Sequence, residues 1–436
     1  MSIALSSIIL IGGMFIFFVL GVPVAFSIGL SALVYELINP LGSLLAMPQR
    51  LINGVDSFTL MAIPFFVLVG ELMNMGGVTR NIFSFADGLV GHKKGGLARV
   101  NVVASMIFAG MSGSAVADAS GLGAVEMKAM QENGYSKEFS AAVTAASSTI
   151  GPIFPPSITF VIYGSVTSVS IGRLLLGGAV PALMLGGLFL LYISFLAKFG
   201  KLPQPAHGKI PLRDVFKDLK NTAPALLTPI ILIGGIIFGF FTPTEASAIA
   251  CLYSLILGLF VYKELTLKDI AKAFVRAALT TAQIMFIIST AAYLGLILAK
   301  AQIPQIVFSS FINLFEASNK FIVLLILNVL LLIIGTVIDT NPMLIIICPI
   351  LAPIAAELGI DATHFGVIIV FNLMIALLTP PVGMVTYTTC RVAQCPMDTY
   401  TKALLPWLGV LIVGLILVNV FPFLSTFVPN LFLGAM

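Results

Sequence analysis

Polar, glycine-rich stretches interrupt two apolar segments of this sequence, at residues 111–118 and 335–342, and their oxygen atoms could coordinate a cation. Prolines interrupt two more apolar segments, at residues 147–157 and 378–383. Proline removes a backbone donor and blocks the preceding turn, so carbonyl oxygens beside it lack helical partners. Such hard oxygen ligands suit Na⁺, while the positively polarised N-termini of half-helices suit a carboxylate. The four interruptions together predict a site for an ion and an anion.

Two carboxylates, Asp118 and Asp339, stand within the two glycine-rich interruptions. A carboxylate inside an apolar segment is a candidate functional residue, because burying it without compensation costs several kcal/mol. An Asp at the start of a half-helix can instead cap that helix by accepting backbone N–H bonds, and the sequence leaves both roles open. For Glu71 and Glu245 we expect capping or hydrogen bonding between helices.

The composition places these residues in a membrane. Of 436 residues, 59% are apolar and 9% charged, against roughly 25% charged in a soluble domain. The 39 glycines and 24 prolines break the hydrophobic stretches, which lipid tolerates only where protein or a water-filled cavity satisfies the freed backbone groups. We therefore expect an all-α polytopic membrane protein with broken helices, surrounded by lipid. A dispersed net charge of +4 indicates no nucleic-acid partner.

The residue types do not favour an enzyme. His92, His207 and His364 form no HExxH motif, which disfavours an intramembrane metalloprotease. An aspartyl-type intramembrane protease would need two facing carboxylates; Asp118 and Asp339 could be that pair, but their glycine- and proline-rich setting fits coordination better. We therefore expect no catalytic residue and no organic cofactor.

A two-fold internal repeat organises the chain, because a shift of 225 residues pairs Gly110 with Gly335, Pro155 with Pro380 and Pro181 with Pro406. Each repeat is expected to contain a re-entrant helical hairpin and a discontinuous helix. The first repeat, 1–197, has scaffold spans at 3–38, an arm helix at 42–57, a hairpin at about 100–128 and a broken span at 139–165. A linker follows at 198–222. The second repeat, 223–436, has scaffold spans at 223–262, an arm helix at 263–277, a span at 278–299, a hairpin at about 321–353 and a broken span at 365–390.

Loop charges predict that the two repeats have opposite orientations in the membrane. The linker carries six basic residues and is expected to be cytoplasmic. Residues 42–57 contain one basic residue and their counterpart, 263–277, contains four, whereas residues 91–99 contain three and their counterpart contains one. This opposite bias is what an inverted repeat requires, with both termini periplasmic. A parallel repeat with loop composition set by chance is the alternative.

Several motifs resemble the large membrane subunit of tripartite ATP-independent periplasmic (TRAP) transporters, the M subunit or DctM-like family. They are GSAVADASGLGAVEMKAM at 113–130, IGPIFPPSI at 150–158, GFFTPTEASA at 239–248 and GIDATHFGVIIVFNLMIALLTPPVG at 359–383. The resemblance spans nearly the whole chain. It implies sodium-driven uptake of an organic acid, such as a C4-dicarboxylate or a sialic acid, across the bacterial inner membrane. An elevator mechanism is also implied, in which a transport domain slides against a scaffold.

The resemblance further implies two partners and a set of site residues. The partners are a small four-helix membrane (Q) subunit and a periplasmic substrate-binding (P) protein. The first sodium region is carried over to Ser112, Gly113, Ser114, Ser148, Thr149, Gly151 and Pro152. The second is carried over to Asp339, Thr340, Asn341, Thr379, Pro380 and Gly383. Candidate substrate ligands are Ser112, Ser114, Asp118, Ser157, Asp339 and Asn341.

Two other transport functions remain open at this point. A divalent-anion/sodium symporter of related architecture would work without a binding protein. A channel would allow flux without concentrative uptake and with little dependence on sodium.

Overall fold

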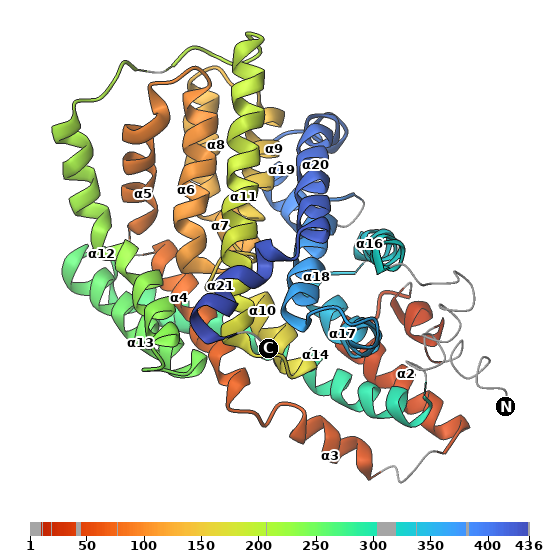
Figure 1. The fold of residues 1–436 in the computed structure, drawn as a ribbon. Coiled ribbons are helices and arrows are strands. Elements are labelled where there is room, and N and C mark those ends of the chain that lie inside the picture. The colour runs from red at the N-terminus through yellow and green to blue at the C-terminus, as the bar shows by residue number, and fades with distance from the viewer. Residues whose placement is uncertain are drawn as a thin grey trace.

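The computed structural model describes residues 10, 12–18, 20–40, 45–75, 77–205, 207–302, 320–336, 338–380 and 383–434. Over these ranges every regular element is helical (Figure 1). Seven helical segments in this part of the chain are long and apolar enough to cross a membrane, and shorter apolar helices stand beside them. The protein is thus an all-helical, multi-span membrane protein, as the composition predicts.

The helices of the first half end before residue 199. They are Val24–Ile38 (α2), Ala46–Asn53 (α3), Thr59–Met61 (η1), Ala62–Met75 (α4), Val78–Ala86 (α5), Asp87–Gly91 (η2), Gly96–Ser112 (α6), Ala115–Ser120 (α7), Leu122–Glu132 (α8), Lys137–Ser148 (α9), Ile158–Thr167 (α10) and Ile171–Lys198 (α11). The helices of the second half follow the linker. They are Leu212–Ile237 (α12), Pro243–Ile256 (α13), Leu257–Val261 (η3), Leu267–Lys300 (α14), Lys320–Gly335 (α16), Thr340–Glu357 (α17), Ala362–Ala376 (α18), Met384–Ala393 (α19), Met397–Val420 (α20) and Phe423–Leu433 (α21).

The predicted helix breaks coincide with gaps between these helices. Gly21 has a φ of +78°, and α2 begins directly after Pro23. In the second half, Thr242 begins α13 with a capping box in which its hydroxyl and the Glu245 carboxylate satisfy each other's backbone N–H groups. The capping role expected for Glu245 is therefore confirmed.

Three features differ from the expected elements. The arm helix 263–277 and the span 278–299 form one continuous helix, α14, because neither glycine nor proline occurs between its capping box at Thr266 and Gly295. Helix α12 begins at Leu212, inside the stretch predicted as linker. Helices α5 and α21 were not predicted, because both are too short to register as spans.

The first helices of the two broken spans form the centre of the molecule. All residues of α18 from Thr363 to Ala376 are buried, as are all residues of α9 from Ser140 to Ser148. Helices α11 and α20 pack side by side against this centre (Figure 1). Helix α4 packs on α13 and α14, and α14 in turn packs on α2 and α4. Helices α9 and α18 lead into the two proline-containing interruptions, and α4 and α14 form the wall beside the two glycine-rich ones.

Candidate functional site

A cavity of about 580 Å³ lies where both glycine-rich interruptions meet the wall formed by α4 and α14. The first interruption contributes residues 112–117 and the second contributes Asp339, Thr340 and Asn341. Residues of the two halves that are more than 200 positions apart in sequence therefore share one cavity. Seven of the predicted ligands line it: Ser112, Gly113, Ser114, Pro152, Asp339, Thr340 and Asn341.

Four helices begin at this cavity. The first residues of α7, α10, α17 and α19 all belong to its lining, namely Ala115, Ile158, Thr340 and Met384. The N-terminus of a helix carries a partial positive charge and unpaired N–H groups. Four such ends around one cavity favour a negatively charged ligand, as the sequence predicts for a carboxylate.

The first interruption packs its backbone directly against the break between α9 and α10. Gly113 has a φ of +60°, and a Cβ added there would lie 2.4 Å from the Pro156 carbonyl oxygen. A Cβ on Gly151 would lie 3.5 Å from the Ser114 carbonyl carbon. Gly113 is therefore required by the close approach of two unwound segments, whereas the contact of Gly151 with Ser114 is an ordinary van der Waals contact. The Ser112 hydroxyl is buried here without a hydrogen-bond partner, which suits a cation ligand.

The other hydroxyls predicted for the first sodium region already have partners. Ser148 donates to the Ala145 carbonyl at 2.8 Å and Thr149 donates to the Ala146 carbonyl at 2.6 Å. Both side chains are fully buried and neither lines the cavity. A hydroxyl oxygen that donates its hydrogen still has lone pairs, so these two hydrogen bonds do not conflict with the predicted sodium role.

The residues predicted for the second sodium region do not all lie at the cavity. Asp339, Thr340 and Asn341 face the cavity, whereas Thr379, Pro380 and Gly383 lie outside its lining. The Thr379 hydroxyl donates to the Ile375 carbonyl at 2.8 Å, and a Cβ on Gly383 would lie 2.7 Å from the Leu377 carbonyl oxygen. Val337, Pro381 and Val382, which also belong to these interruptions, lie outside the described residues.

Two predicted substrate ligands are placed away from the cavity. Ser157 is fully buried, donates to the Pro152 carbonyl and accepts from the Phe160 N–H, so it caps α10. Asp118 is fully buried inside the first hairpin and is absent from the cavity lining. Ser114, not Asp118, caps α7. Neither Ser157 nor Asp118 lines this cavity, and their contact with the substrate stays a prediction.

A buried polar cluster that the sequence analysis missed lies in the same hairpin as Asp118, whose own carboxyl oxygens are buried without a hydrogen-bond partner. Asn101 donates to Glu126 and to Thr144 at 2.7 Å each, and it accepts from Ser147 at 2.8 Å. These side chains come from α6, α8 and α9, so they join the first hairpin to the broken span. The hydrogen-bonded partners lie 25 to 46 residues apart in the sequence, too far for a local sequence pattern to indicate the cluster.

The wall opposite the hairpins carries polar residues, of which the sequence analysis singled out only Glu71. Helix α14 presents Arg276, Thr280 and Gln283, and α4 presents Glu71 and Asn74. Arg276 Nη1 lies 3.7 Å from Glu71 Oε2, so Glu71 has an interhelical ion pair where capping or an interhelical hydrogen bond was expected. The spacing i, i+4, i+7 of the α14 residues was the available signal, since it puts them on one face of an otherwise apolar helix.

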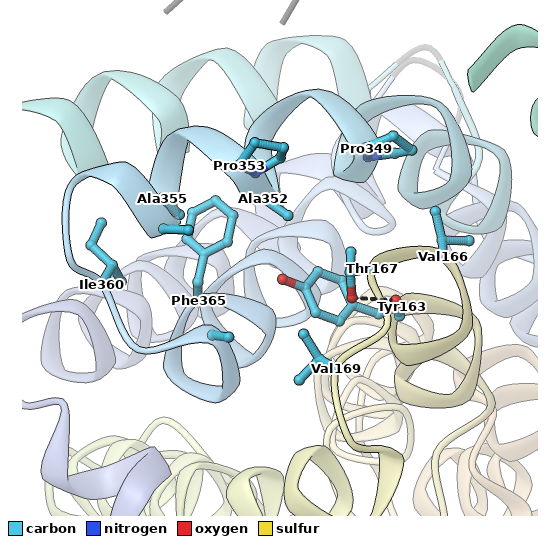
Figure 2. A pocket seen from close by; sticks show the side chains of 12 residues that line it. Tyr163, Val166, Thr167, Val169, Pro349, Ala352, Pro353, Ala355, Ile360 and Phe365 are labelled. Atoms are coloured by element: carbon cyan, nitrogen blue, oxygen red, sulfur yellow. Dashed lines mark hydrogen bonds between the residues drawn. The ribbon is translucent and has the colours of Figure 1, made fainter. Parts of the chain in front are cut away.

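A second cavity, of about 430 Å³, lies between α10 and α17 and shares no residue with the first (Figure 2). Its lining is apolar apart from Tyr163 and Thr167, and the Thr167 hydroxyl donates back to the Tyr163 carbonyl at 2.7 Å. Such a lining offers little to a charged substrate. Among the described residues, no group of three His, Cys, Asp or Glu side chains is arranged to hold a metal. The first cavity is therefore the candidate site.

Residues 11–424 match the DctM component of the tripartite ATP-independent periplasmic transporter family. The chain belongs to this family. It is 44% identical over 415 residues to the sialic acid TRAP transporter large permease protein SiaM of Vibrio cholerae, covering 95% of this chain and 96% of that protein. It is 38% identical over 456 residues to the C4-dicarboxylate TRAP transporter large permease protein DctM of the same organism, covering 100% and 99%. The resemblance noted in the sequence is thus confirmed.

One further relative and one solved structure are also similar to this chain. The sialic acid TRAP transporter permease protein SiaT of Haemophilus influenzae is 40% identical and matches 94% of this chain, but the chain spans only 66% of that protein. The YdaH transporter of Alcanivorax borkumensis shares the fold at a TM-score of 0.65 and 13% identity, covering 85% of this chain and 87% of that one. Members of this permease family are transporter components, not enzymes.

Proposed function

We propose that this chain is the membrane carrier of a TRAP system that takes up a small organic acid, driven by sodium. The observation that carries the proposal is the shared cavity, where unwound segments of both halves meet four helix N-termini. The N-termini favour the carboxylate, and the hydroxyl and main-chain oxygens behind them favour a hard cation. One cavity with both kinds of ligand provides for coupling between the two.

Inverted repeats and an elevator motion form part of this proposal. Helices α2 and α4 correspond in the repeat to α13 and α14. Helix α2 packs on α14, and α4 packs on α13. Each of these helices of the first half therefore contacts the counterpart of the other one in the second half. This exchange supports a two-fold relation between the halves, and the opposite loop charges support an axis within the membrane plane. Such a frame, with α4 and α14 as scaffold, would let the hairpins slide past it with the substrate.

The substrate class and the partners follow from the relatives as proposals. SiaM and SiaT are named for sialic acid and DctM for C4-dicarboxylates, so a sialic acid is the first candidate and a C4-dicarboxylate the second. SiaT exceeds the match by about a third of its length, which leaves room for a fused small subunit. We accordingly place this chain in the inner membrane with a separate Q subunit and a P protein, the linker cytoplasmic and both termini periplasmic.

Reconstitution tests the proposal. Purified chain, small subunit and binding protein in proteoliposomes should accumulate labelled N-acetylneuraminic acid or succinate when a sodium gradient is imposed, and should not when potassium replaces sodium. Uptake without the binding protein would favour the divalent-anion/sodium symporter. Equilibration without accumulation, independent of sodium, would favour a channel.

A further inference from the structure

The candidate cavity contains one basic side chain. Its lining includes Arg276 on α14, with Glu71 on α4 and Asp339 at the second hairpin as the charged neighbours. A carboxylate substrate that enters this space meets two carboxylates already present. The helix N-termini supply partial charges only, so a full positive charge is needed to offset the repulsion, and Arg276 is the lining residue that carries one.

The guanidinium group of Arg276 is loosely held. In the described part of the chain its ion pair is with Glu71, at an Nη1–Oε2 distance of 3.7 Å, well beyond the 2.7–2.9 Å of a charge-assisted hydrogen bond. The Arg276 side chain is 62% exposed and that of Glu71 is 26% exposed. A guanidinium group has five N–H donors in a planar fork, so the one long ion pair with Glu71 leaves donors available to a ligand.

The position of Arg276 fits a role in binding. Thr280 and Gln283 lie on the same face of α14, one and two turns further along, and both line the cavity. Together the three residues form a polar path along the wall that faces both hairpin tips. A carboxylate at Arg276 can therefore interact with hydroxyl and amide groups on the wall and with helix N-termini on the hairpins.

We propose that Arg276 recognises the carboxylate of the substrate and that Glu71 is its counter-ion when the substrate is absent. The substrate carboxylate replaces Glu71 as the partner of Arg276, and Glu71 reclaims the guanidinium group when the substrate leaves. Glu71 thus limits how tightly the cavity holds the anion, which favours release. This inference rests on the proposed function. It assigns the selectivity of the carrier for anionic substrates to the wall formed by α4 and α14.

Equilibrium binding to the purified complex in detergent tests the assignment, with labelled N-acetylneuraminic acid and succinate as probes at saturating sodium. Arg276→Gln should raise the Kd of the transported acid by about tenfold or more, because a bidentate charge-assisted contact is lost. Arg276→Lys should give an intermediate Kd, since the charge remains without the fork. Glu71→Gln should lower the Kd by about threefold, because the competing carboxylate is removed.

Lys272→Gln is the matched control. Lys272 lies one turn before Arg276 on α14, is 64% exposed and pairs with Asp269 at 3.7 Å, but does not line the cavity. Its Kd should stay within about twofold of the wild type. The sodium concentration for half-maximal uptake should be unchanged in all variants. If the wild type transports an acid that Arg276→Gln binds equally well, the assignment is overturned; if the wild type transports neither acid, the proposed function itself fails.

Discussion

The first and second hairpins are attached to the molecule in different ways. Helix α6 packs against α7, α8 and α9, so the first hairpin closes on itself and on its own broken span. Helix α16 packs chiefly against α18, whereas α17 packs against α10 of the other half and against α14 of the wall. The first hairpin therefore packs on itself as well as on its neighbours, which include α19 of the other half, whereas the second is held mainly by elements outside its own hairpin.

The buried hydrogen bonds that attach the two hairpins also differ. The first hairpin is joined to α9 through Asn101, whose amide holds the carboxylate of Glu126. The second is joined to α18 through three neutral amides, in which Asn372 donates to Asn328 at 2.8 Å and Asn328 donates to Asn419 at 2.9 Å. The first connection combines a carboxyl group, an amide and two hydroxyls in one fully buried cluster, so breaking it at Asn101 leaves more buried polar groups without a partner than breaking the second.

The largest effect is expected from Asn101→Ala. This change leaves Glu126, Thr144 and Ser147 without a shared partner in a fully buried cluster, at a cost of about 3 kcal/mol. Denaturant unfolding in detergent micelles measures it, with Asn133→Ala as the control at an exposed end of α8. A loss no larger than that of the control would show that the cluster does not stabilise the first hairpin.

Gly113→Ala should act on function at the first tip. A residue with a Cβ at this φ of +60° costs about 1–2 kcal/mol, and the added atom would overlap the Pro156 carbonyl. We expect sodium-dependent uptake to fall about tenfold, since 1.4 kcal/mol corresponds to that factor. Gly134→Ala is matched in backbone strain, with a φ of +85°, but has open space around it. Equal losses in both variants would mean that strain alone, not the contact with the broken span, matters.

Asn372→Ala tests the neutral connection of the second hairpin. The substitution leaves the amide of Asn328 short of one partner, and we expect a loss of about 1 kcal/mol in the same unfolding assay. The ratio between Asn101→Ala and Asn372→Ala then measures the difference between the two hairpins directly. A larger loss for Asn372→Ala would reverse the comparison.

How much the sequence predicts depends on whether the signal is local. Proline and glycine act on the residues beside them, so the breaks before Val24 and Pro243 and the interruptions at both tips could be predicted. The continuity of α14 was not predicted, because the repeat suggested a separate arm helix where the first half has α3. Two other features could not be predicted: the cluster around Asn101 and the ion pair of Glu71 with Arg276. Both form between helices that are distant in sequence, so no local sequence pattern indicates them.

The smallest effect concerns the linker, which is anchored to the first half by a titratable pair. His207 Nε2 lies 2.8 Å from Asp87 Oδ2, and His207 Nδ1 lies 2.8 Å from the Gly208 carbonyl oxygen. A neutral imidazole donates from one nitrogen only, so satisfying both oxygens requires the protonated ring. The Gly208 carbonyl, and after it the Asp87 carboxylate, raises the pKa of His207 above its usual value.

A raised pKa fixes the direction of the pH dependence. The stabilising contribution of His207 is fully present below its unfolded pKa and is lost as the pH rises through the folded pKa. Because both side chains are partly exposed, at 32% and 21%, the effect should stay below about 1 kcal/mol. Hydrogen exchange across residues 198–211 should therefore quicken between pH 6 and pH 8.5 beyond the intrinsic change, and His207→Gln should abolish that extra increase. An equal rise in hydrogen exchange in His207→Gln would show that other contacts anchor the linker. The ion pair between His207 and Asp87 would then not count as an attachment of the linker to the first half.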